Sequence, residues 1–184
     1  MTQDVRLGVV LLCHAELDAA AQMVRIWAAG GARVSIHIDA KAPAKAVARM
    51  QAALSDLPDI VYSRRHRCNW GGFSLVKATQ DAAQLLLDSF PDTTHVYLAS
   101  GSCLPLRPVR ELAAFLALDP DRDHIESVSA YDVGWTVGGL NEERFTLFHP
   151  LDWRRRRWLF DRLVAWQRAL RIRRRLPKGI APHL

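Results

Sequence analysis

Short apolar runs alternate with stretches of helical periodicity through the first two thirds of this 184-residue chain. The runs are short and β-prone, which predicts strands over residues 7–12, 34–39, 60–62 and 96–99. Apolar residues recur every three or four positions between them, which predicts helices over residues 16–29, 43–54, 74–87 and 109–118. Such alternation is typical of a mostly parallel sheet with helices on both faces. The predicted fold class is therefore α/β.

Two of the predicted strands end in polar residues that suit a ligand site. Residues 100–103 (Ser-Gly-Ser-Cys) follow the strand over 96–99, and Asp39 ends the strand over 34–39. In open α/β sheets the ligand crevice lies beyond the carboxyl ends of the strands. We therefore expect substrate there, although an ordinary strand–turn–helix connection explains residues 100–103 as well. Asp39 is either an acceptor for a ribose or a solvated acid near Lys41.

The connection over residues 63–73 is dense in arginine and contains Trp70 beside two glycines. An aromatic ring can stack on a sugar or base while glycines let backbone approach a ligand. Core packing at the helix entry is the alternative for Trp70. Ser74 is predicted to cap the helix that follows.

The sequence lacks the motifs of several common classes of enzyme. Neither a Walker phosphate loop nor a Gly-x-Gly-x-x-Gly dinucleotide motif occurs. Asp119, Asp121 and Asp123 could hold Mg²⁺, but the proline among them favours a surface turn. The three cysteines, odd in number and without metal-ligand spacing, are expected to be reduced, with packing favoured over a reactive thiol for Cys103. His14 and His37 are predicted to be buried and hydrogen-bonded. We expect no cofactor and no bound metal.

The chain ends in a strongly basic segment. Residues 154–178 hold 11 of the 25 basic residues and one acid, a charge of +10, whereas the rest of the chain carries −4. A further strand is predicted over 124–127, a loop over 131–150, and a basic amphipathic helix from Trp153 that Pro177 and Gly179 end. We divide the chain into a ligand-binding domain, residues 1–150, and a basic arm, residues 151–184. The arm from Arg154 to Arg175 suits an anionic membrane surface, or is simply a solvated face.

No apolar run has the length of a transmembrane helix, and the start lacks the pattern of a signal peptide. The sequence therefore predicts a cytoplasmic protein, with peripheral membrane attachment through the basic arm as a variant. No nucleic-acid partner is expected.

Three motifs in order give a family resemblance. Residues 37–41 (His-Ile-Asp-Ala-Lys), 69–76 (Asn-Trp-Gly-Gly-Phe-Ser-Leu-Val) and 97–106 (Tyr-Leu-Ala-Ser-Gly-Ser-Cys-Leu-Pro-Leu) resemble those of core-2/I-branching β-1,6-N-acetylglucosaminyltransferases and the related peptide O-xylosyltransferases. The chain looks like a bacterial member. The resemblance implies a GT-A-like, Rossmann-like fold and an inverting transfer of N-acetylglucosamine or xylose from a UDP-sugar to a glycan or protein hydroxyl. It also implies that no bound divalent metal is required.

The resemblance also implies roles for individual residues. Asp39 matches an acid expected near the uridine, Trp70 and Ser74 match the Trp and the Ser of one family motif, and Ser100 and Gly101 match a loop beside the reacting sugars. The donor-binding set is completed by His14 and Arg64. Residues 141–145 are similar to an acceptor-binding segment, which makes Glu142, Glu143 and Arg144 the acceptor candidates.

Two departures from the family pattern qualify these roles. Cys103 stands where family members commonly have Asp, so no role of that acid is carried over. Residues 175–181 resemble the segment upstream of a Gly-Ser-x-Trp stretch, so the general base is expected beyond Leu184, and the chain is expected to be the N-terminal part of a transferase. The alternatives are a non-catalytic nucleotide-sugar or glycan-binding remnant and a membrane-surface protein that acts through its basic arm.

Overall fold

The structure is a computed structural model, and it describes residues 4–129, 143–151 and 156–179. The chain forms two compact units, residues 1–122 and residues 123–184. Each unit is described by itself.

The first unit is built on a four-stranded sheet of β1 (Leu7–Cys13), β2 (Arg33–Ile38), β3 (Ile60–Tyr62) and β4 (His95–Ser100), in the order β3-β2-β1-β4. Every pair in the sheet is parallel, and Val10 on the central strand lies opposite Ser35 on one side and Leu98 on the other. The parallel α/β sheet predicted from the sequence is thus confirmed, with no strand boundary shifted by more than one residue.

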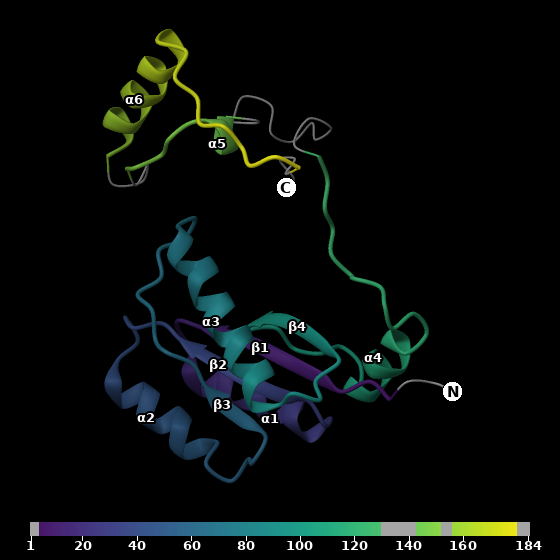
Figure 1. Ribbon diagram of the computed structural model, residues 1–184. Coiled ribbons are helices and arrows are strands. Elements are labelled where there is room, and N and C mark those ends of the chain that lie inside the picture. The colour runs from purple at the N-terminus through teal and green to yellow at the C-terminus, as the bar shows by residue number, and fades with distance from the viewer. Residues whose placement is uncertain (1–3, 130–142, 152–155, 180–184) are drawn as a thin grey trace. The chain divides into compact units, whose positions relative to one another are not determined.

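Helices cover both faces of this sheet, as predicted (Figure 1). They are α1 (Leu17–Ala29), α2 (Ala44–Ala53), α3 (Phe73–Ser89) and α4 (Val109–Leu116). Side chains of β1 alternate between the two faces, so Val9 and Leu11 join the larger core with α1 and α2, while Val10 packs with Ala82 and Leu86 of α3. Leu11 and Leu86 are completely buried.

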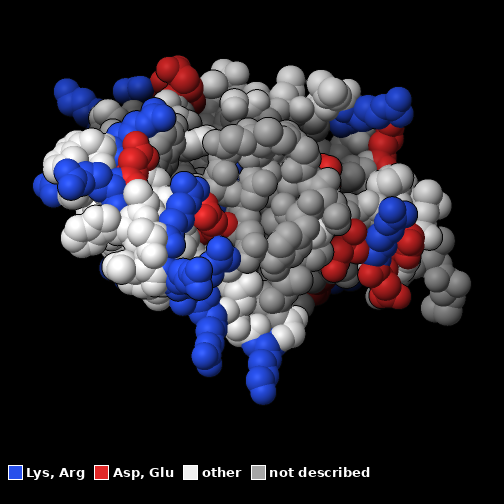
Figure 2. Space-filling model, turned by 90° about the horizontal axis from the view of Figure 1, so that it is seen from above, with Lys and Arg blue, Asp and Glu red and all other residues white. Residues whose placement is uncertain are grey.

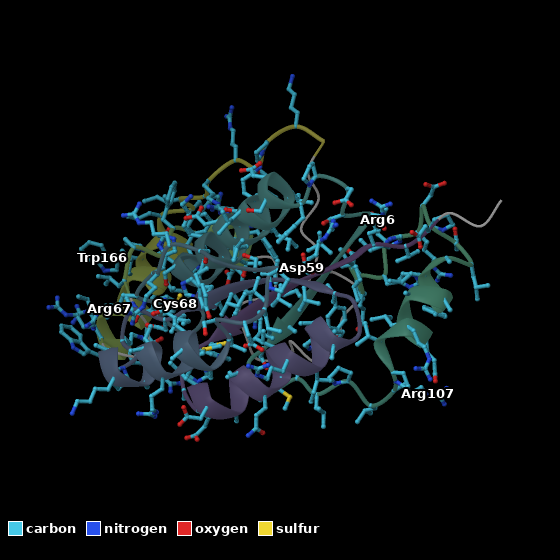
Figure 3. All side chains as sticks on the ribbon, turned by 90° about the horizontal axis from the view of Figure 1, so that it is seen from below. Arg6, Asp59, Arg67, Cys68, Arg107 and Trp166 are labelled. Atoms are coloured by element: carbon cyan, nitrogen blue, oxygen red, sulfur yellow. The ribbon has the colours of Figure 1, made fainter. Side chains whose placement is uncertain are left out.

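The chain order of the strands creates a switch point at β1. From β1 the chain moves outward through β2 and β3, and then returns to place β4 on the other side of β1. Connections leave β1 and β4 in opposite directions at such a point, which opens a crevice at the carboxyl ends of the strands. Arg6 and Asp59, which precede β1 and β3, lie at the opposite end of the sheet from Cys68 (Figure 3).

The second unit contains α5 (Glu143–Thr146) and α6 (Arg157–Ala169). Gln167 of α6 is buried, and its side-chain amide accepts from Phe148 N at 2.8 Å and donates to Phe148 O at 3.0 Å. The His149 ring stacks on Phe160 with 5.4 Å between centroids. These contacts fasten the inward face of α6 to the segment that follows α5.

Three predictions for this part of the chain are wrong, the first because α5 interrupts the loop predicted over residues 131–150. Residues 124–127 form no strand, and the basic helix ends at Ala169, well before Pro177 and Gly179. Arg171 takes a left-handed φ of 53°, which turns the chain out of the helix. No helix among the described residues combines the length and apolar character needed to cross a membrane.

Candidate functional site

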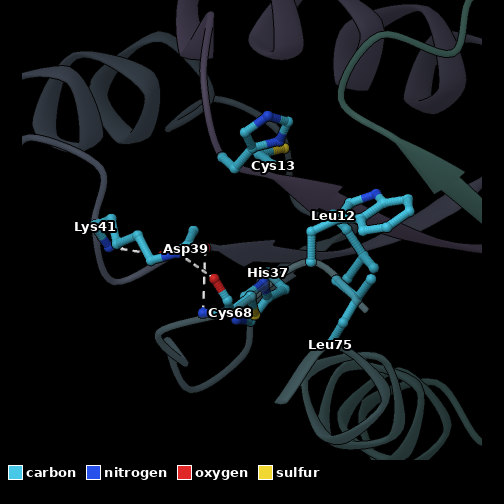
Figure 4. A pocket seen from close by; sticks show the side chains of 9 residues that line it. Leu12, Cys13, His37, Asp39, Lys41, Cys68 and Leu75 are labelled. Atoms are coloured by element: carbon cyan, nitrogen blue, oxygen red, sulfur yellow. Dashed lines mark hydrogen bonds between the residues drawn. The ribbon is translucent and has the colours of Figure 1, made fainter. Parts of the chain in front are cut away.

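A pocket of about 250 Å³ opens at the carboxyl ends of β1 and β2 in the first unit (Figure 4). Its walls come from the ends of these strands, from the loop between β3 and α3, and from the first turn of α3. The lining residues are Leu12, Cys13, His14, His37, Asp39, Lys41, Cys68, Trp70 and Leu75. Three of the predicted donor-binding residues, His14, Asp39 and Trp70, therefore share one cavity.

Asp39 fastens two segments that are far apart in the sequence. Its side chain is buried, with one carboxylate oxygen accepting from Lys41 N at 2.8 Å and the other from Cys68 N at 3.2 Å. Asp39 N in turn donates to Cys13 O at 2.8 Å. The carboxylate thus joins the ends of β1 and β2 to the loop after β3, so it is not the solvated acid that was the alternative.

Arg65 provides a second fastening that the sequence analysis missed. Its guanidinium donates to the carbonyl oxygens of Asp39 and Ala42 at 2.9 and 3.0 Å and to that of Ile38 at 3.3 Å. Five N–H donors in a rigid fork allow one arginine to satisfy several carbonyls of a turn. The sequence singled out Arg64, which is exposed and does not line the pocket. An arginine-dense loop indicates that some arginine is structural, but not which one.

His37 lies at the floor of the pocket and is 2% exposed. Its Nε2 accepts the backbone N–H of His66 at 3.0 Å, so in the neutral ring the proton resides on Nδ1. Burial, and secondarily the nearby His66, holds the pKa of His37 below its usual 6.5. The predicted buried, hydrogen-bonded histidine is therefore confirmed for His37, whereas His14 is exposed at the pocket wall and that prediction is wrong.

A polar chain leads from His37 away from the pocket. The His66 ring stacks on His37 at 5.8 Å, and its Nε2 lies 2.7 Å from a carboxylate oxygen of Asp81. The other oxygen of Asp81 accepts from Lys77 at 2.6 Å. Lys77, and then His66, lower the pKa of Asp81, so this carboxylate stays charged behind the two rings.

Lys41 brings a positive charge to the rim of the pocket. Its ammonium donates to Cys68 O, and a longer contact of 3.4 Å reaches the Asn69 side-chain oxygen. Both partners are neutral oxygens, and no ion pair involves the Lys41 ammonium among the described residues. The ammonium is therefore positioned without being neutralised by a carboxylate.

Trp70 is held at the mouth of the pocket by the turn around it. The ring is 72% exposed, and Gly71 beside it has a φ of 73°, a left-handed conformation that glycine adopts at little cost. The alternative in which Trp70 packs in the core is therefore excluded.

The predicted cap at Ser74 is wrong, because α3 begins one residue earlier, with Gly72 as its N-cap. The Ser74 hydroxyl instead accepts from Asn69 N at 2.9 Å and closes the turn that carries Trp70. Ser74 does not line the pocket itself.

The turn after β4 lies at the same edge of the sheet but outside the pocket lining. Ser100 Oγ contacts Ser102 Oγ at 2.9 Å and Cys103 Sγ at 3.2 Å, and the hydrogen bonds of the Ser100 side chain and backbone N–H to Cys103 lower the pKa of Cys103. A Cβ on Gly101 would stand 3.1 Å from Cys13 Sγ, so this glycine allows a close approach of the two strand ends.

Burial raises the pKa of Cys13 to about 12, which makes it an inert thiol. All three cysteines are free, as predicted.

Comparison with known families decides the identity of the fold. Residues 10–152 match the Core-2/I-Branching enzyme family, and this range contains the whole pocket. The chain belongs to the Core-2/I-Branching enzyme family. No individual curated protein matches the chain. Membership indicates a glycosyltransferase that uses a nucleotide-sugar donor and an acceptor.

The acceptor candidates of this branching-enzyme family member lie in the second unit. Glu142 is outside the described residues, and Arg144 is exposed on α5. Glu143 forms an ion pair with Arg168 of α6, at 2.9 Å from Nε, and this contact lowers the pKa of Glu143. Glu143 therefore fastens α5 to α6. Within the described residues no cluster of three or more His, Cys, Asp or Glu side chains is arranged to hold a metal ion.

Proposed function

We propose that the pocket binds the nucleotide of a UDP-sugar and that the protein transfers N-acetylglucosamine or xylose with inversion to a hydroxyl of a glycan or protein. The observation that carries this proposal is the pocket at the carboxyl ends of β1 and β2, where Asp39 and Arg65 fix the walls and Trp70 and Lys41 stand at the mouth. Family membership supports the reaction class.

The chemistry of the lining suits the parts of such a donor. The Trp70 ring offers an exposed face for stacking on uracil or sugar. The Lys41 ammonium offers a positive charge to the diphosphate, which gains negative charge as UDP departs. The ring of His37, whose Nε2 accepts from His66 N, lines the same pocket. No step of this proposal requires a metal ion.

In the proposed transfer, the acceptor hydroxyl oxygen forms a bond to the anomeric carbon as the bond from that carbon to the diphosphate oxygen breaks. Attack from the face opposite UDP inverts the configuration. The hydroxyl proton passes to a general base, and the electron pair of the broken bond leaves with UDP. We assign the base to no described residue, because the one carboxylate of the pocket, Asp39, already accepts a backbone N–H on each oxygen.

A transfer assay with chelator present tests this proposal. The full chain is given UDP-N-acetylglucosamine or UDP-xylose with glycan and peptide acceptors, and release of UDP and the anomeric configuration of the product are measured. Lys41→Gln should raise the KM for the donor about tenfold, as expected for loss of one charge-assisted contact, whereas Lys45→Gln on the exposed face of α2 should not. Equal KM values for the two variants would contradict the role of Lys41.

One observation favours a second candidate, a protein that binds nucleotide-sugar without turnover. Both oxygens of Asp39 accept backbone N–H groups, so no carboxylate among the described lining residues is left disengaged. The transfer assay distinguishes the two candidates. Saturable binding of the donor without release of UDP, with every acceptor tested, would favour the binding protein over the transferase.

A further inference from the structure

Helix α6 carries two exposed tryptophans on one face. Trp158 and Trp166 are each 66% exposed, and they lie eight residues apart, with Arg162 midway between them. A spacing of four and eight residues places all three on the same side of a helix. Leu170 and Ile172, directly after the helix, are 65% and 43% exposed and extend the apolar surface. We call this set the tryptophan face of α6.

The tryptophan face has no partner among the described residues. No hydrogen bond, ring contact or ion pair joins the side chains of Trp158, Trp166 or Arg162 to another described residue. The opposite side of α6, with Val164 and Gln167, is buried. Figure 3 shows Trp166 projecting outward from the helix. The helix is thus held from one side and presents large apolar rings on the other.

Positive charge surrounds these rings. Nine basic residues and a single acid, Asp161, lie between Arg156 and Lys178. Asp161 contacts Arg157 at 3.9 Å and Glu143 holds Arg168, whereas no carboxylate among the described residues pairs with Arg162, Arg171 or Arg175. Figure 2 shows blue Lys and Arg side chains beside uncharged, white ones at the left of the view.

The rings and charges of the tryptophan face together indicate which kind of partner it binds. Tryptophan favours the boundary between lipid headgroups and acyl chains, because its body is apolar and its indole N–H needs a polar partner. Arginines beside it can keep their guanidinium groups among anionic headgroups while their stems cover apolar surface. A nucleic acid would use the charges but would gain much less from the apolar residues Leu170 and Ile172. We infer that the tryptophan face of α6 docks the protein on an anionic lipid surface, with the helix lying in the interface and not crossing it.

The inference is independent of the donor site, since it uses only residues of the second unit. Sedimentation of the full chain with vesicles tests it. Vesicles of phosphatidylcholine are compared with vesicles in which about a third of the lipid is phosphatidylglycerol, and we expect binding to the second kind only, weakened at high salt. Equal binding to both kinds, or to neither, would overturn the inference.

Paired variants separate rings from charges. Trp158→Ala with Trp166→Ala should lower the partition coefficient at least tenfold, because binding strength follows the apolar area that enters the interface. Arg162→Gln with Arg175→Gln should lower it about twenty-five-fold, at about fivefold for each charge. The matched control, Arg107→Gln with Arg110→Gln on the first unit, should leave it unchanged, and circular dichroism checks the fold of each variant. Full binding by the tryptophan variant, or tighter binding of the chain to duplex DNA than to anionic vesicles at equal salt, would refute lipid docking.

Discussion

Asp39 shows how one buried carboxylate can hold together the walls of a pocket. Replacing it by alanine leaves Lys41 N and Cys68 N without their acceptor. An unsatisfied N–H costs about 1–3 kcal/mol when it is fully buried, and these two are part-buried, so Asp39→Ala should lower the free energy of unfolding by about 2–4 kcal/mol in urea denaturation. The exposed Asp121→Ala is the control and should change little. A variant as stable as the parent would show that Asp39 does not fasten the loop.

His37 should make stability depend on pH. Its environment consists of His66, Asp39, Arg65 and Asp81, and burial lowers its pKa in the folded protein. The unfolded chain takes up this proton as pH falls through about 6.5 and the folded chain does not, so stability is full above that pH and declines below it, by at most about 1.4 kcal/mol per pH unit.

The measurement for His37 is the free energy of unfolding at several pH values from about 7.5 to 5. His37→Gln should flatten the decline, whereas His14→Gln, at an exposed position, should keep it. Asp81 contributes below this window, because its own lowered pKa makes it lose charge only in stronger acid. A decline of equal slope in parent and His37→Gln would exclude burial of His37 as the cause.

At the scale of elements, α3 fixes the pocket because its buried face holds it against the sheet. Leu86 is completely buried beside Val10, whereas its neighbour Leu87 is 41% exposed. Leu86→Ala should therefore cost about 2–5 kcal/mol of stability and Leu87→Ala less than about 0.5 kcal/mol. Thermal or urea unfolding of the two variants measures the difference. Similar losses for both would mean that α3 does not pack as described.

The sequence predicted an element well where neighbouring residues determine it, and poorly where hydrogen bonds between distant segments do. The strands and first helices follow from apolar runs and periodicity, and Gly31 ends its helix with a φ of 86°, as the Gly-Gly pair indicated. The prediction that Ser74 caps α3 is wrong, because its hydroxyl oxygen accepts the backbone N–H of Asn69, five positions earlier. Hydrogen bonds that join distant segments, such as those of Arg65 to the turn after β2, leave no periodic signal in the sequence.

For the site as a whole, family motifs brought together residues that spacing alone could not. Asp39 and Trp70 are 31 positions apart in the sequence and line one pocket. The motifs did not show which residues line the pocket and which only hold its walls in place. Ser74 and Arg64 do not line the pocket, whereas Lys41 and His37 do. That distinction depends on which way each side chain leaves its loop.

At the scale of the whole molecule, we assign different partners to the two units: a nucleotide-sugar to the first and a lipid surface to the second. The charges of the sequence agree with this division, since the basic segment over residues 154–178 carries +10 and the remainder −4. The central claim is that the pocket of the first unit is a donor site.

The most direct test is calorimetric titration of UDP into the full chain with chelator present throughout, repeated with Lys41→Gln. We predict one saturable site for the parent and about tenfold weaker binding for the variant, because the ammonium faces the diphosphate. UDP-N-acetylglucosamine and UDP-xylose, titrated in the same way, would then rank the two donors. No heat of binding with UDP or either UDP-sugar, or equal affinity of parent and variant, would contradict the assignment of this pocket.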